Sequence, residues 1–265
     1  MVLAVTLGLN SGEHPERRQR TRDEALAANA QLNRTFEDLQ ALAREHRRCL
    51  AALEESQRDA LARLAHLSEL ARGGSLSRLV KLGRLAARIG LATGLPQDQC
   101  ALLCRAAPLL DVGDVSPQPT AASSGARRRN PAPGGSCHTL AGAAILADND
   151  HPLFVMARGI VRHHHERWDG KGFPSGLAAG AIPLPAQIAS AAEYCEMLIG
   201  ELTTPSPDVI RDCIALESGG RFAPKLALAM SVACEELLSI VAATDAQYRD
   251  RDPGVFSSRD FDWPC

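Results

Sequence analysis

The chain has 265 residues, 45% of them hydrophobic, and a formal net charge of −2 at pH 7. This length and apolar content suit one globular domain with an extension. The balanced charge and the 4% aromatic content argue against general nucleic-acid binding. The eight cysteines form no CxxC pairs, which argues against a zinc finger and favours a reducing, cytoplasmic location.

The N-terminal part is predicted to be a disordered stretch followed by a long helical arm. Residues 1–20 are expected to be disordered; residues 1–9 are apolar but lack a basic leader and are too short to span a bilayer, so we expect neither an export signal nor a membrane span. Residues 21–72 contain neither proline nor glycine. Residues spaced alternately by three and four form a heptad pattern: Phe36, Leu39, Ala43, His46, Leu50, Leu53, Gln57, Ala60, Leu64 and Leu67. This pattern predicts a coiled-coil arm that forms a parallel homodimer, and the alternative is a helix packed back on its own domain.

An all-α domain is predicted over residues 73–246, because no segment alternates apolar and polar residues as a strand would. The expected helices are 77–92, 97–110, 138–148, 153–165, 185–199, 207–216 and 224–243. Residues 116–136 are rich in Pro, Ser, Gly and Ala and predict a flexible loop. The Arg127, Arg128, Arg129 run in that loop is either a solvated charge cluster or a phosphate contact. Residues 247–265 are expected to be a flexible tail.

A histidine run at the end of one predicted helix indicates a metal site. His164 continues the apolar stripe of Ala157 and Ile160, so we expect its imidazole to be buried and to need a partner. His165 follows where the helix ends, and a change of backbone direction lets adjacent histidines reach one ion. The alternative is that His163, His164 and His165 form a solvated run that binds metal adventitiously.

Three further donors lie in other segments. His138 begins an apolar helical segment, and Asp111 follows a nearly uncharged run, where it is either a helix cap or a ligand. Glu193 shares a helix face with Ala189 and Met197, where a carboxylate is costly without a cation. Imidazole and carboxylate donors together suit a divalent transition metal of the iron or manganese type and require no thiolate.

The eleven residues 164–174, HHERWDGKGFP, resemble the signature of the HD-GYP family, a branch of the HD phosphohydrolases. The resemblance covers about residues 67–243. It implies an HD-domain helical bundle that binds two or three metals and hydrolyses the bacterial second messenger cyclic di-GMP. It also implies a loop that contacts substrate or a partner such as a GGDEF-domain protein, formed by Asp169, Gly170, Gly172, Phe173 and Pro174.

The chain departs from this family at its name-giving motif. The family's His-Asp-x-Gly-Lys resembles residues 110–114, where the metal histidine is Leu110 and the lysine is Asp114. The resemblance makes Asp111 the bridging ligand at the catalytic centre, with a complete second-ion set of Asp111, His138, His164 and His165. Glu193 stands where the family has its last metal aspartate. One bound ion is therefore expected, with two as the alternative, and catalysis should be impaired or lost.

Three functions of different classes follow. The favoured hypothesis is a degenerate HD-GYP module that regulates by binding cyclic di-GMP or a partner protein. The second is a slow but active metal-dependent cyclic di-GMP phosphodiesterase. The third is a dimerisation scaffold that binds neither metal nor nucleotide.

Overall fold

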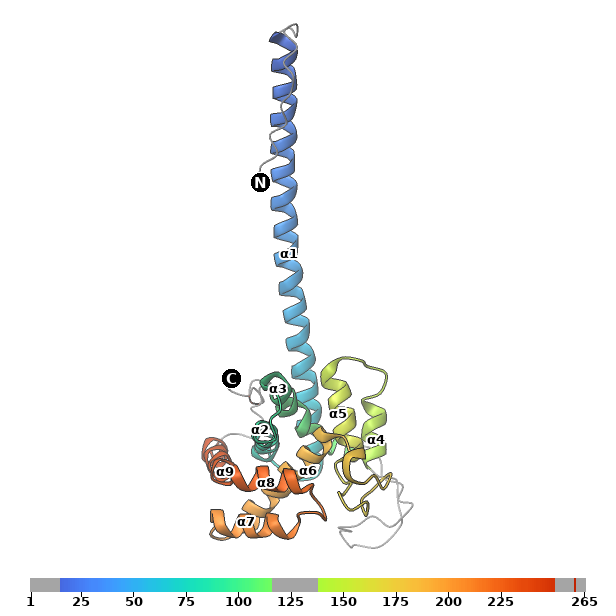
Figure 1. Cartoon of the computed structure of the whole chain (residues 1–265), viewed down its shortest axis with the longest axis vertical. Coiled ribbons are helices and arrows are strands. Elements are labelled where there is room, and N and C mark those ends of the chain that lie inside the picture. The colour runs from blue at the N-terminus through green and yellow to red at the C-terminus, as the bar shows by residue number, and fades with distance from the viewer. Residues whose placement is uncertain (1–14, 116–137, 251–259, 261–265) are drawn as a thin grey trace. The chain divides into compact units, whose positions relative to one another are not determined.

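The computed structural model describes residues 15–115, 138–250 and 260. Within these residues the chain is helical without a named β-strand, which confirms the all-α prediction (Figure 1). The elements are α1 (Pro15–Ala71), α2 (Leu76–Ala92), α3 (Gln97–Ala106), η1 (Ala107–Leu109), η2 (Val112–Val115), α4 (His138–Ile145), α5 (Pro152–His163), η3 (Ala179–Ala181), α6 (Leu184–Glu201), α7 (Pro207–Leu216), α8 (Pro224–Val232) and α9 (Cys234–Tyr248).

The chain divides into two compact units between Ser56 and Gln57. The first unit is the N-terminal part of α1, and the second is the helical domain. The last turns of α1 therefore belong to the helical domain, whereas the sequence placed that boundary near residue 72. The cause is packing: Leu61 and Ala65 are buried in the core of the domain.

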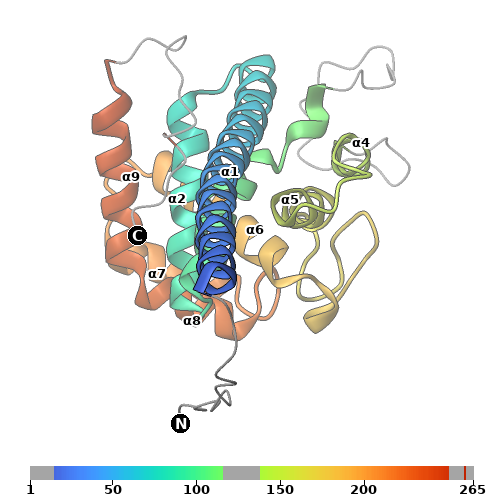
Figure 2. The same ribbon diagram turned by 90° about the horizontal axis from the view of Figure 1, so that it is seen from above.

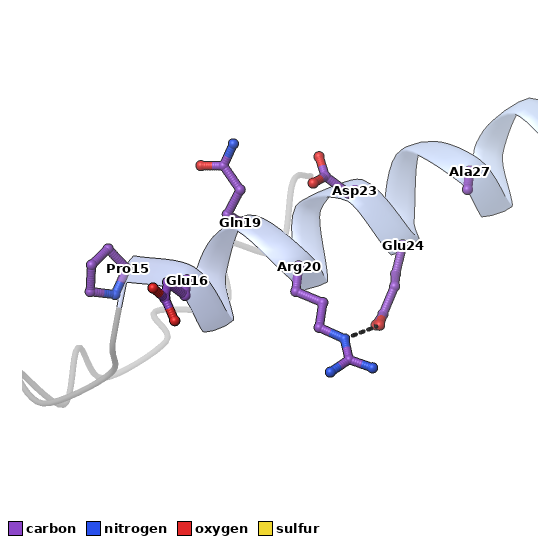
Figure 3. Close-up of a pocket in the computed structure, with 7 residues that line it drawn as sticks. All are labelled: Pro15, Glu16, Gln19, Arg20, Asp23, Glu24 and Ala27. Carbon is purple, nitrogen blue, oxygen red and sulfur yellow. Dashed lines mark hydrogen bonds and ion pairs between the residues drawn. The ribbon is translucent and has the colours of Figure 1, made fainter.

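In the first unit, α1 begins at Pro15, so the expected disorder is wrong for residues 15–20. Proline at the first position and Glu16 in the first turn both favour a helix start. The surface of these first turns is polar, and Arg20 Nε donates to Glu24 Oε1 at 3.1 Å (Figure 3). Residues 1–14 lie outside the described part of the chain.

The predicted seam of the arm is exposed in this single chain. Phe36 and Leu39 are 60% and 64% exposed, and Leu50 and Leu53 are 47% and 55% exposed. Leu64 instead packs against the core of the helical domain. Pairing of the arm through its exposed seam remains a prediction.

In the second unit, α2 lies at the centre of the helical domain. It contacts α3, α6 and α9. Helix α5 contacts α3, and it also contacts α4 and α6, which lie on either side of it in Figure 2. Ser75 caps α2 by accepting the backbone N–H of Arg78 at 3.2 Å. The largest fully buried side chains come from most of these helices and include Leu79, Leu82, Leu85, Ile89, Leu103, Ile160, Ile188, Ile210 and Phe222.

Several predicted helices end elsewhere than expected. The segment predicted over 97–110 is α-helical only to Ala106 and continues as a 3₁₀ turn that contains Pro108. The segment predicted over 138–148 ends at Ile145, and Asp148 adopts a positive φ of 58°. The segment predicted over 224–243 is two helices, α8 and α9, bent by 63° at a break at Ala233. In the described part of the chain no single helix is long and apolar enough to cross a membrane; α8 and α9 meet that criterion only when joined.

Two sequence predictions fall largely on residues outside the described structure. The loop over 116–136, with its arginine run, lies wholly outside it. Of the expected tail, α9 extends to Tyr248, whose hydroxyl donates to Asp260 Oδ1 at 2.7 Å. Most of the remaining tail is outside the described residues.

Candidate metal centre

Four of the five predicted ligands converge in the helical domain. Asp111 lies between η1 and η2, His138 is the first residue of α4, and His164 and His165 directly follow α5. One ligand atom from each residue lies within 4.8 Å of the others. The turn after α5 thus lets adjacent histidines face one point, as the sequence predicted.

Asp111 is held from both its backbone and its side chain. Ser68 near the end of α1 donates its hydroxyl to the carbonyl oxygen of Asp111 at 2.8 Å. Oδ1 of Asp111 lies 3.4 Å from His138 Nε2 and 3.7 Å from His164 Nε2. This oxygen therefore faces the imidazoles.

A contact between two glycines brings His138 beside Asp111. A Cβ on Gly113 would lie 1.9 Å from the carbonyl oxygen of His138 and 2.6 Å from the amide nitrogen of Gly142. A Cβ on Gly142 would lie 2.5 Å from Cγ1 of Val161. Only glycine allows η2, α4 and α5 to approach this closely.

Hydrogen bonds orient the imidazole of His164, and a carboxylate lies near that of His138. His164 is fully buried, and its Nδ1 lies 3.2 Å and 3.0 Å from the carbonyl oxygens of Ile160 and Val161. Carbonyl oxygens only accept, so Nδ1 carries a proton, and in the neutral imidazole Nε2 is the atom that offers a lone pair to the cluster. His138 Nδ1 lies 3.8 Å from Asp114 Oδ1, so a carboxylate stands behind this histidine, as is common in metal sites.

Burial and mutual charge interactions shift the pKa of these groups. Burial would raise the pKa of Asp111, but its interaction with His164 and the charge of Arg72 lower it below its ordinary value. Burial and the charges of His164 and His138 lower the pKa of His165 to about 2. The pKa of His164 shifts the other way: burial lowers it, but the interaction with Asp111 and the charge of Glu193 raise it above its ordinary value. An ionised carboxylate and neutral imidazoles are the forms that bind a metal, so an ion would take the place of the second proton of His164.

The glycine-rich turn after the histidines is fixed by Glu166, which is 4% exposed. Its Oε1 accepts the N–H of Ser175 at 2.8 Å, and its Oε2 accepts the N–H of Leu177 at 3.0 Å. A Cβ on Gly172 would lie 2.4 Å from the amide nitrogen of Arg167, so the chain folds back without room for a side chain. The loop is therefore tightly defined.

Phe173 connects this loop to the metal centre. Its ring stacks on the imidazole of His165 with centroids 4.6 Å apart and an interplanar angle of 29°. Its N–H donates to the carbonyl oxygen of His165 at 3.3 Å, and the Phe173–Pro174 peptide bond is cis. The aromatic ring at this position thus packs directly on a candidate ligand.

Glu193, the fifth predicted ligand, faces arginines. Its Oε1 lies 3.6 Å from Arg78 Nη2, and its Oε2 lies 4.0 Å from Arg221 Nη2. Burial and repulsion by Asp111 raise the pKa of Glu193. The residue lies at the edge of the cluster but is not among the four whose ligand atoms converge.

The sequence reasoning did not identify four residues that shape this centre: Ser68, Arg72, Arg78 and Glu166. Arg72 forms an ion pair with Oδ2 of Asp111, and Arg78 lies among Glu69, Asp111 and Glu193. With Glu193 and Arg221, these arginines line a pocket of about 430 Å³. Only the buried Glu166 had a signal in the sequence, as a carboxylate directly after the histidine pair.

The donor set fits one divalent ion with nitrogen and oxygen ligands. Three imidazoles and one carboxylate could hold a divalent transition metal and would leave coordination positions for water or a ligand oxygen. Leu110, at the place of the family histidine, is 1% exposed within the apolar core and offers no electron pair. The four convergent residues therefore offer the ligands of one ion.

Comparison with known proteins identifies the family. The model of the HD domain family matches residues 24–211. The chain belongs to the HD domain family. A crystal structure of a cyclic GMP-AMP specific phosphodiesterase from V. cholerae matches 78% of this chain and 55% of its own, with a TM-score of 0.53 and 18% identity, which supports the fold.

Curated relatives of this HD domain are cyclic dinucleotide phosphodiesterases, which confirms the resemblance to the HD-GYP type. A cyclic di-GMP phosphodiesterase response regulator, RpfG of Xanthomonas campestris, is 30% identical over 56% of this chain and 39% of its own length. A cyclic di-GMP phosphodiesterase of Thermotoga maritima is 26% identical over 65% and 46%. A 3'3'-cGAMP-specific phosphodiesterase of Vibrio cholerae is 25% identical over 72% and 37%. The chain thus spans less than half the length of these relatives.

Proposed function

We propose that this HD domain is a degenerate module of bacterial cyclic di-GMP signalling that binds one divalent metal and has weak or no phosphodiesterase activity. One contrast between neighbouring residues carries the proposal. Asp111 faces His138 and His164, whereas Leu110 lies in the apolar core, 1% exposed. One half of a two-ion site has its donors, and the other half lacks a histidine.

The four retained ligands explain why metal binding would survive although hydrolysis of the cyclic dinucleotide is weak. A bound ion of the iron or manganese type would polarise a phosphoryl oxygen. Asp111, His138, His164 and His165 hold that ion in place, and Phe173 keeps His165 oriented by stacking. The clamp that two ions exert on the attacking and leaving oxygens is missing, and Asp114 stands where the family has a lysine.

The proposed module regulates by binding a ligand or a partner protein. The module acts by binding a cyclic dinucleotide at the metal centre or a signalling protein, such as a GGDEF-domain protein, at the loop of residues 169–174. Glu166 accepts the N–H groups of Ser175 and Leu177 directly after that loop, and this anchoring suits a preformed contact surface. The arm forms a parallel homodimer through its exposed heptad seam, and the protein acts in the bacterial cytoplasm.

The test is turnover of cyclic di-GMP and 3'3'-cGAMP by the purified chain with added Mn²⁺ or Fe²⁺, with products separated by chromatography. The Xanthomonas campestris relative serves as comparator. We expect hydrolysis slower by about a hundredfold or more, the cost of losing a transition-state donor. Turnover at the comparator's rate would refute the proposal that the catalytic site is degenerate. If calorimetry detects neither metal binding nor nucleotide binding, the result would instead support the hypothesis of a dimerisation scaffold.

A further inference from the structure

We infer that the guanidinium groups of Arg72 and Arg78 take the place of a second metal ion beside Asp111, so that the centre accepts a single divalent cation. The inference rests on the proposed one-ion function and identifies the groups that enforce it. Leu110 alone removes one donor. The arginines occupy the free carboxylate oxygens and supply positive charge on this side of the centre.

The two oxygens of Asp111 face different partners. Oδ1 lies 3.4 Å from His138 Nε2 and 3.7 Å from His164 Nε2. Oδ2 is in direct contact with Arg72 Nη1, and Arg78 Nη2 lies 3.8 Å from it. A carboxylate that bridges two ions offers one oxygen to each ion. Here the second oxygen is engaged by arginine.

Arg78 joins the two carboxylates that a second ion would need. Its Nη2 lies 3.8 Å from Asp111 Oδ2 and 3.6 Å from Glu193 Oε1. Its Nη1 donates to Glu69 Oε2 at 2.8 Å, and Glu69 is 3% exposed. An ion bound between Asp111 and Glu193 would have to displace this guanidinium, which is anchored from behind by a buried carboxylate.

The turn between α1 and α2 places both arginines. Arg72 follows the last residue of α1, and the turn that follows contains Gly73 with φ +73°. A Cβ on Gly74 would lie 1.8 Å from Glu69 Oε1, so glycine there leaves room for the anchor of Arg78. Asp114, which replaces the family lysine, receives Arg72 Nε at 3.3 Å. The exchange of lysine for Asp114 therefore adds a second anchor for Arg72.

The positive charges of the two arginines also oppose the binding of a second ion. A guanidinium keeps its proton at every pH a protein tolerates, so both arginines remain cations. Asp111 Oδ2 and Glu193 are already paired with them, and a divalent ion in the same space would meet two fixed positive charges. The side of the centre away from the histidines is therefore closed to a second ion.

The experiment measures manganese bound per chain by elemental analysis after equilibrium dialysis of the full chain against MnCl₂. Wild type should bind one ion, and the Arg72→Gln/Arg78→Gln double variant should bind two, because Asp111 and Glu69 lose these guanidinium groups and Glu193 keeps only Arg221. The matched control is Arg88→Gln/Arg211→Gln, whose arginines pair with Glu236 and Glu235 in α9. This control should bind one ion, as wild type does.

The outcomes separate the inference from the proposed function. One ion in wild type and one in the folded double variant would overturn the inference alone, whereas no ion in wild type would overturn the proposed function. Electron paramagnetic resonance of wild type needs no variant to fold: the inference predicts an uncoupled Mn²⁺ spectrum at every manganese excess. A spin-coupled manganese pair in wild type would overturn it.

Discussion

The ring of Phe173 stacks on the imidazole of His165 at a centroid distance of 4.6 Å. The glycine-rich loop and the metal centre are thereby one packed unit, since the loop supplies a wall for a candidate ligand. The phenylalanine provides this contact without the hydroxyl that the HD-GYP family places there. Loss of the ring should therefore affect metal binding, while the hydroxyl should matter little.

Phe173→Leu should weaken manganese binding, because an aromatic pair contributes about 0.5–1.5 kcal/mol beyond its buried area. This corresponds to a dissociation constant raised by up to about tenfold. Phe173→Tyr keeps the ring and should bind as wild type does. Isothermal titration of both variants is the measurement, and equal affinity in all three proteins would show that the stacking does not support His165.

His164→Ala should abolish metal retention, because His164 is fully buried and its Nε2 faces the other donors. His163→Ala is the matched control: this neighbour lies outside the four-residue group and should leave the metal in place. Elemental analysis of the two purified variants decides the point. Equal metal content would mean that the ion is bound by the histidine run adventitiously.

Gly113→Ala should disrupt the centre from behind, because the new Cβ would lie 1.9 Å from the carbonyl oxygen of His138. The displacement should cost about 1–3 kcal/mol of unfolding free energy, as overpacking does, and should weaken metal binding. In contrast, a Cβ on Gly159 of α5 meets nothing within 4 Å, so Gly159→Ala should be neutral or stabilising by about 0.5–1 kcal/mol. Urea denaturation measures both, and an unaffected Gly113→Ala protein would refute the close approach.

Glu166→Ala should loosen the glycine-rich loop, because the N–H groups of Ser175 and Leu177 lose their acceptor. Leaving such donors unsatisfied costs about 1–3 kcal/mol. Asp212→Ala, on the exposed surface of α7, should change stability by less than about 0.5 kcal/mol. Hydrogen exchange of residues 169–177 should rise only in the first variant. Unchanged protection there would mean that other contacts hold the loop.

We predict that the arm forms a dimer and that this dimer depends on the exposed heptad seam. Phe36→Lys/Leu53→Lys places charges on two exposed seam positions and should give a monomer by multi-angle light scattering. Leu42→Lys is the control, because Leu42 is 62% exposed but lies off the seam. Truncation should remove residues 1–56 and no more, since Leu61 and Ala65 belong to the domain core. A dimer that persists in the double variant would place the interface elsewhere.

Local patterns in the sequence were sufficient for most helices and for four convergent ligands. His164 was predicted to be buried from the spacing of Ala157 and Ile160, and it is fully buried. The break at Ala233 carries neither glycine nor proline, and the sequence around it reads as one continuous helix. Only packing of α8 and α9 against the rest of the domain reveals that bend.

The cation side of the centre could not be predicted, because its contacts join residues far apart in the chain. Arg72 pairs with Asp111, which lies 39 residues later in the chain, after α2, α3 and η1. The sequence indicated that Glu193 needs a cation, and in the structure the nearest cations are Arg78 and Arg221. An apolar helix face shows that a carboxylate requires a partner, but only the fold shows which partner it has.

The metal-to-protein ratio of the purified wild-type chain, measured by elemental analysis after saturation with Mn²⁺ and removal of free ion, tests the central claim most directly. We predict one ion per chain, bound by Asp111, His138, His164 and His165. Leu110 offers no donor, and the two arginines close the other half of the centre to a second ion. Two ions per chain, or none, would contradict it.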